Sequence, residues 1–170
     1  NRDLAAARAA SAAAEAQADR TGDLEHARLI GAIVVNESGD NARALDVFTL
    51  LSQSTREDIA ARAGLEMIRT QLLLDEINED DAAAALDPLR FRWRGDAFEL
   101  SVNQTLGALY VQMGRWRDGL DVMRAAAKRF PDHPLGRQLR QDMSALFESL
   151  FLDGEADKLE PVQALGLFYD

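Results

Sequence analysis

The chain has 170 residues, of which 47% are hydrophobic and 28% are charged, a balance typical of a globular domain with a real core. Its formal net charge of -10 repels phosphate backbones, which argues against nucleic-acid binding, and no apolar run approaches the roughly 20 residues of a membrane span. The absence of cysteine excludes disulfides, thiolate metal sites and cysteine nucleophiles.

The first twenty residues are dominated by alanine. Between residues 2 and 19 there are ten alanines and a single leucine. Such a composition has high helix propensity but offers little apolar surface to bury. We therefore expect an extra helix over residues 1–20 that rests on the helix after it.

Beyond residue 20, apolar residues recur every three or four positions, which is the helix period. Short polar breaks separate helix-length segments, and Ser, Asp and Asn stand at their starts, where a side-chain oxygen can cap unpaired N–H groups. The four prolines, at 88, 131, 134 and 161, suit helix ends or first turns. The pattern predicts an all-α fold of about eight or nine helices, arranged as antiparallel hairpins because the connections are short.

The stretch from Leu106 to Pro131 shows one hairpin most clearly. A glycine at 114 separates two helical segments, and small residues recur at Gly107 and Gly119, where two helix axes can approach closely. A similar stretch lies 75 residues earlier and aligns Gly39, Ala44, Phe48 and Leu51 with Gly114, Gly119, Met123 and Ala126; in the preceding segments it aligns Ala32 and Val35 with Gly107 and Tyr110.

This layout resembles the tetratricopeptide repeat, a helix-turn-helix unit of about 34 residues that ends in proline. The match rests on Leu106, Gly107, Tyr110, Gly114, Trp116, Ala126 and Pro131. The resemblance implies a right-handed superhelix of hairpins within one domain over residues 1–170. Its hairpins would cover 23–54, 55–94 and 97–131, with a divergent final hairpin over 134–170; the middle one fits the family pattern poorly.

The family usually has alanine at the place of Gly119, so the resemblance implies that Gly119→Ala is tolerated or stabilising. It also implies that Trp116 and Tyr110 pack within the hairpin or against a neighbouring one. The chain starts at Asn1 rather than Met, and we interpret it as part of a longer, bacterial repeat protein. The sequence leaves its compartment open between the cytoplasm and the cell envelope.

No catalytic pattern stands out. His26 and His133 lack metal-ligand spacing, no serine lies in a nucleophile elbow, and no glycine loop has a phosphate-binding pattern. The acidic run over 75–81 lacks the ligand order of a calcium loop. We therefore expect a protein that is not an enzyme and that uses no cofactor or metal.

Repeat arrays of this kind bind partners along a concave face. If the family geometry applies, the first helix of each hairpin lines that face, and the implied partner-binding residues are His26, Leu29, Ile33, Asn36, Glu37, Ser101, Gln104, Ala108, Val111 and Gln112. The leading hypothesis is a protein–protein interaction scaffold that binds a protein or peptide in this groove. Two alternatives stay open: a structural segment that packs against the rest of its own parent chain, and a helical accessory domain of a larger enzyme.

Overall fold

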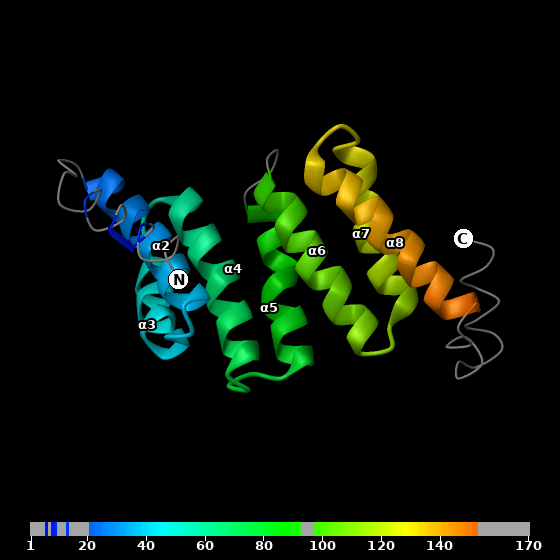
Figure 1. Ribbon diagram of the computed structural model, residues 1–170, viewed down its shortest axis with the longest axis horizontal. Helices are drawn as coiled ribbons and strands as arrows, with labels where there is room; N and C mark the ends of the chain where they lie inside the picture. Colours follow the sequence, from blue (N-terminus) through cyan, green and yellow to red (C-terminus); the bar gives the residue numbers. More distant parts are fainter. Residues whose placement is uncertain (1–5, 7, 10–12, 14–20, 93–96, 153–170) are drawn as a thin grey trace. The chain divides into compact units, whose positions relative to one another are not determined.

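The computed structural model describes residues 21–92 and 97–152, together with residues 6, 8, 9 and 13 (Figure 1). The described ranges 21–92 and 97–152 hold seven helices and no strand, which confirms the all-α expectation for this part of the chain. The chain divides into two compact units, Asn1–Trp93 and Arg94–Asp170. The expected helix over residues 1–20 and the end of the final hairpin lie outside the described residues, apart from residues 6, 8, 9 and 13.

Between residues 21 and 92, the first unit contains four helices in two hairpins: α2 (Thr21–Glu37), α3 (Asn41–Leu51), α4 (Glu57–Leu73) and α5 (Glu79–Arg92). Each helix packs against the next, and α2 also touches α4. Phe48 of α3 and Ile59 of α4 are completely buried and belong to one apolar cluster shared by α2, α3 and α4. The second helix of the first hairpin thus covers the first helix of the next.

The second unit repeats this arrangement with α6 (Ala97–Gln112), α7 (Trp116–Arg129) and α8 (Pro134–Leu152). Here α6 packs on α7, α7 on α8, and α6 also touches α8. The apolar cluster joins Leu100, Met123 and Leu139, one residue from each helix. Three consecutive helices therefore share a core in the same way in both units.

In the three hairpins whose turns the structure describes, the first helix ends in the same backbone turn. Gly39, Asp75 and Gly114 have positive φ angles of 93°, 56° and 73°, and they lie 36 and 39 residues apart. Each is the residue at which the chain leaves its helix. Because L-residues with a side chain rarely adopt this left-handed conformation, glycine is the usual occupant, and Asp75 is the exception.

Matching hydrogen bonds close these turns. After Gly114, the N–H of Arg115 donates to the Tyr110 carbonyl at 2.7 Å, and Gly114 itself donates to Val111 at 3.0 Å. Together they form a Schellman motif, which satisfies carbonyl groups left over at a helix end. The same pair of bonds closes α2, from Asp40 to Val35 and from Gly39 to Asn36, and α4, from Glu76 to Gln71 and from Asp75 to Leu72.

The second helices also correspond, once they are counted from their first capping residues, Asp40, Asn78 and Arg115. Asn78 stands three positions after its turn residue, whereas the other two follow theirs directly. With this allowance, the fourth, eighth and eleventh positions after each cap are all buried: Ala44, Phe48 and Leu51; Ala82, Leu86 and Leu89; Gly119, Met123 and Ala126. The middle hairpin has the same plan as the others. Two extra turn residues between Asp75 and Asn78 shift its second helix along the sequence, so the match is not seen from the spacing alone.

Some local expectations need correction. Pro88 lies inside α5, four residues before its end, rather than at a helix end or in a first turn. It is exposed and close to the end of the helix, where losing one N–H donor disturbs little of the remaining structure. Side-chain capping is also less general than expected: Asn78 accepts a 2.8 Å bond from the Asp81 N–H, whereas Asp40 caps nothing through its side chain.

Candidate partner-binding faces

The first helices of the three hairpins expose residues at equivalent places. Counted back from the turn residues, the second position is exposed in all three hairpins, and the sixth and third positions are partly or fully exposed. These residues are Ile33, Asn36 and Glu37 on α2; Arg69, Leu72 and Leu73 on α4; Ala108, Val111 and Gln112 on α6. Six of these nine residues are among those that the resemblance implied. The three on α4 were missed, because the hairpin could not be aligned until its turn at Asp75 was known.

Other implied residues differ in their exposure. His26 is exposed and Ser101 is half-exposed, but Leu29 is only 3% exposed. Leu29 belongs to the apolar cluster beneath α2, together with Ala32 and Phe48. Its equivalent in the third hairpin is Gln104, which is half-exposed. The surface therefore keeps His26 and Gln104, whereas Leu29 contributes to the core.

Gln104 lies in a small polar cluster between α6 and α8. Its Nε2 donates to Asp142 Oδ2 at 3.4 Å, and Gln138 Nε2 donates to the other Asp142 oxygen at 2.8 Å. The carboxylate thus connects the exposed face of α6 to that of α8 within the second unit. This contact explains how Gln104 is held while part of it remains exposed.

Val111 belongs partly to the hairpin interior. A Cβ atom added to Gly119 would lie 2.8 Å from Val111 Cγ2, so this side chain packs directly against the α7 backbone. On α2, the equivalent Asn36 has a buried Oδ1 with no hydrogen-bond partner. Ala108 and Gln112, in contrast, are exposed and are the best probes of the α6 face.

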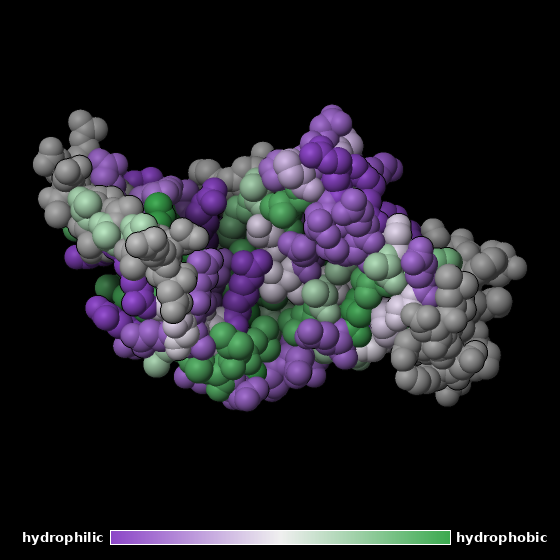
Figure 2. All heavy atoms as spheres, in the orientation of Figure 1, coloured by the Kyte–Doolittle hydropathy of each residue, from purple (hydrophilic) through white to green (hydrophobic). Residues whose placement is uncertain are grey.

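Exposed apolar side chains add to the surface of the first unit. Figure 2 shows apolar surface at the end of α4, beside the α4–α5 turn, where Leu73 is 63% exposed. Phe91 on α5 is 56% exposed, and the Arg90 guanidinium lies 5.4 Å from the centre of its ring. The exposed face of α4 is thus apolar at the position where α6 carries Gln112.

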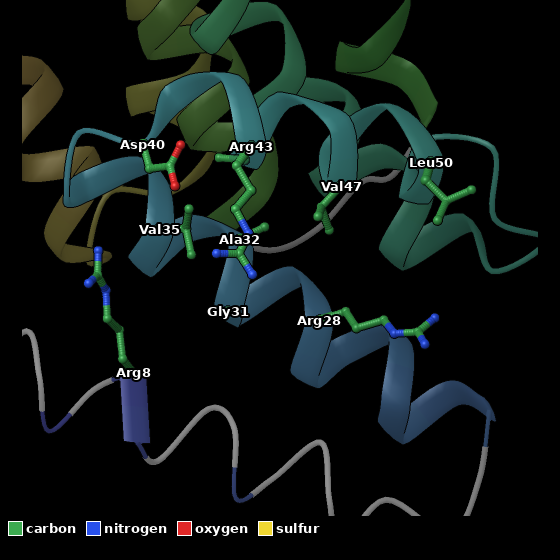
Figure 3. A pocket seen from close by; sticks show the side chains of 10 residues that line it. Arg8, Arg28, Gly31, Ala32, Val35, Asp40, Arg43, Val47 and Leu50 are labelled. Atoms are coloured by element: carbon green, nitrogen blue, oxygen red, sulfur yellow. The ribbon is translucent and has the colours of Figure 1, made fainter.

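A pocket that the sequence did not reveal lies between α2 and α3. It has a volume of about 610 Å³, and its floor consists of small and apolar residues. Arg43 and Val47 reach into it from α3 (Figure 3). The lining residues are Arg8, Arg28, Gly31, Ala32, Val35, Asp40, Arg43, Ala44, Val47 and Leu50.

Basic side chains surround this apolar floor. Arg28 and Arg43 are exposed, and neither forms a hydrogen bond or an ion pair with another described residue. Arg8 approaches from the opposite side and donates a hydrogen bond to Ser38 Oγ, just past the end of α2 (Figure 3). A chain with a net charge of -10 therefore places three arginines, together with Asp40, around one apolar pocket.

The described residues contain no group of three or more His, Asp or Glu side chains that could hold a metal ion. The resolved pKa shifts concern one exposed pair: the Arg56 guanidinium lowers the pKa of Asp58 chiefly through a side-chain hydrogen bond, and Asp58 raises that of Arg56. His133 has a structural role, because its Nδ1 accepts the Leu135 N–H at 3.2 Å and caps α8. The Arg56–Asp58 pair and the His133 cap both lie at the starts of helices.

No family model, curated protein or solved structure matches the chain. Among the helices that the structure describes, none combines the length and the hydropathy needed to cross a bilayer. The candidate faces must therefore be interpreted from their own chemistry and geometry.

Proposed function

We propose that the chain is a non-enzymatic protein–protein interaction module, built as an array of tetratricopeptide-like hairpins, that binds a partner protein or peptide along the first helices. One observation carries the proposal: the second helices keep three equivalent buried positions, whereas the first helices keep an equivalent exposed position, two residues before the turn, whose chemistry changes from hairpin to hairpin. A constant core below a variable surface is the plan of repeat proteins that bind along one face.

The surface chemistry favours an extended peptide or a protein segment with apolar side chains. At the second position before the turn, the residues are Glu37, Leu73 and Gln112, which combine a charge, an apolar group and an amide. Amide side chains can pair with a peptide backbone, and exposed leucines can cover apolar side chains of the partner. The expected affinity is concentrated in a few such residues.

The proposal can be tested with a matched pair of alanines. Ala108 on α6 and Ala125 on α7 are both exposed in helices of the same hairpin. A random 12-residue peptide library is selected on the full chain, and the selected peptides are titrated against wild type, Ala108→Arg and Ala125→Arg. We expect Ala108→Arg to weaken binding at least about tenfold and Ala125→Arg to leave it unchanged, with equal melting temperatures for all three proteins.

If both substitutions weaken peptide binding equally, or if neither weakens it, the α6 face is not the binding site. Binding that depends on Leu73 but not on Ala108 would move the site to the first unit. The structural alternative, in which this segment packs against its own parent chain, predicts that no peptide is selected on these faces.

A further inference from the structure

Small residues line the middle of the pocket between α2 and α3. They are Gly31 and Ala32 of α2 and Ala44 of α3. Counted from the turn residues, the equivalents of Gly31 in the other two hairpins are Met67 and Leu106. Met67 packs against the apolar cluster of the first unit, and Leu106 is completely buried. The first hairpin therefore has no side chain at a position where the other two carry a long apolar one.

The other uncharged residues that line the pocket are aliphatic. Val35 belongs to α2, and Val47 and Leu50 belong to α3. The described lining residues include no aromatic ring, amide or hydroxyl group. A sugar or a peptide backbone would lose hydrogen bonds to water in such a pocket without gaining neutral partners, and a nucleobase would find no ring on which to stack. The pocket therefore favours a ligand whose body is an apolar chain.

The charges at the pocket favour an acidic head group on that chain. Arg28 and Arg43 form no hydrogen bond or ion pair with another described residue, whereas Arg8 donates to Ser38. A guanidinium can donate two parallel, charge-assisted hydrogen bonds to one carboxylate. Asp40 also lines the pocket and offsets part of the positive charge, which favours a head group with a single negative charge over one with two.

The order of residues along α3 indicates how such a ligand would lie. Arg43, Val47 and Leu50 are spaced four and three residues apart, so they share one face of the helix over about 10 Å. The Arg43 side chain extends from α3 toward Ala32 (Figure 3), and Leu50 is 65% exposed at the other end of the row. A chain that starts at Arg43 and covers Leu50 removes apolar surface from water, which favours binding.

We propose that the α2–α3 pocket binds an anionic amphiphile, an unbranched alkyl chain that ends in one carboxylate. Arg43 binds the carboxylate, Arg28 adds positive charge, and the chain lies against Val47 and Leu50. The pocket volume of about 610 Å³ is within the range of roughly 300–1,000 Å³ that is usual for small-ligand sites. None of the positions proposed for partner binding lines this pocket, so the amphiphile site goes beyond the proposed function and does not depend on it.

Isothermal titration calorimetry of the full chain with sodium dodecanoate, kept below the concentration at which it forms micelles, tests the site. We expect saturable binding of one dodecanoate per chain. Two probes separate the contributions of the head and the chain: dodecyltrimethylammonium has the same chain with a positive head, and acetate has the carboxylate without the chain. Both should bind at least about tenfold more weakly than dodecanoate.

Two matched pairs of variants locate the site. Leu50 lines the pocket and is 65% exposed, whereas Leu73 lies outside it and is 63% exposed. Leu50→Glu should weaken dodecanoate binding at least about tenfold, and Leu73→Glu should leave it unchanged. Likewise, Arg43→Gln should weaken binding about tenfold, whereas Arg124→Gln, at an exposed arginine of α7, should have no effect. Because all four positions are exposed, we expect equal melting temperatures.

Binding of dodecanoate that does not saturate, or equally tight binding of dodecyltrimethylammonium, would overturn the proposal, because either result indicates unspecific association of the alkyl chain. Equal effects within either matched pair would place the ligand outside the α2–α3 pocket and overturn it as well. If dodecanoate does not bind and Leu50→Glu lowers the mass measured by sedimentation, the pocket is a contact with a second copy of the chain instead.

Discussion

Gly107 on α6 and Gly119 on α7 face each other so closely that neither has room for a methyl group. A Cβ atom at Gly107 would lie 2.6 Å from Met123 Cγ, and one at Gly119 would lie 2.7 Å from the Gly107 carbonyl oxygen. The carbonyl belongs to a helix backbone and cannot move aside as a side chain can. The two glycines thus set the distance between the helices of the third hairpin.

We expect Gly119→Ala to destabilise the protein by roughly 1–3 kcal/mol, because the added methyl group forces the backbones apart. This reverses the expectation from the resemblance, in which alanine at this place was harmless or favourable. Urea unfolding of the full chain measures the change. A gain in stability would show that the α6–α7 contact is looser than described.

Gly64 in α4 provides the matched control. A Cβ atom there would meet Leu89 side-chain carbons at 3.8 and 3.9 Å, which is ordinary van der Waals contact. Gly64→Ala should therefore stabilise the protein by up to about 1 kcal/mol through higher helix propensity. The opposite signs at Gly64 and Gly119 separate the effect of space from the effect of propensity.

Asp75 is the turn residue that glycine would suit better. Its φ of 56° places a side chain in the left-handed region, whereas Gly39 and Gly114 occupy the equivalent turns without that cost. Asp75→Gly should raise the free energy of unfolding by up to about 1 kcal/mol. Gly39→Ala should lower it by about the same amount, although a Cβ there would meet nothing within 4 Å. Thermal melts of both variants measure the pair, and equal signs would contradict the shared turn.

Two aromatic residues should differ in their contribution to stability. Phe48 is completely buried in the cluster of the first unit, so Phe48→Ala should cost roughly 3–5 kcal/mol. Trp116 is only half-buried at the start of α7, and Trp116→Ala should cost clearly less. Chemical denaturation compares the two variants. A larger loss for Trp116 would show that more of its indole is covered than the described residues reveal.

The Arg56–Asp58 pair makes the free energy of unfolding depend on pH in the acidic range. The 2.8 Å ion pair holds the pKa of Asp58 below its usual range, mainly through the side-chain hydrogen bond. A lowered pKa in the folded state stabilises the fold above the pKa of the unfolded chain, and this contribution disappears as the pH falls through the lowered value. NMR titration of the Asp58 carboxyl carbon in wild type and Arg56→Ala should show a higher midpoint in the variant. An unchanged midpoint would mean that the pair does not persist in solution.

Much of the helical plan could be predicted from the sequence, because apolar spacing and glycines report directly on helix faces and turns. The turns at Gly39 and Gly114 and the buried residues Phe48 and Met123 agree with the predicted alignment. A hairpin over 55–94 was expected, but its alignment with the other two could not be found, because Asp75 adopts a backbone angle that is typical of glycine. The place of Pro88 inside α5 was not predicted, because proline is generally disfavoured in helix interiors but is tolerated at this exposed position near the helix end.

The candidate faces were harder to predict than the fold. Exposure depends on the helix that covers a residue, so Leu29 and its equivalent Gln104 differ although they occupy the same place in the repeat. The α2–α3 pocket could not be predicted for a related reason: Gly31 and Ala32 look like ordinary core residues in the sequence, and only the structure shows that they line a pocket. Sequence spacing gives the face of a helix but not its neighbour.

The recurring turn is defined by a positive φ angle and not by the identity of the residue that adopts it. Asp75 shows that the letter can change while the angle and its two hydrogen bonds remain. Related chains could replace these glycines one at a time, because each replacement costs less free energy than the total stability of the domain. Every helix would then keep its register. Such related proteins would keep the same fold after their sequences had diverged too far to show their common ancestry.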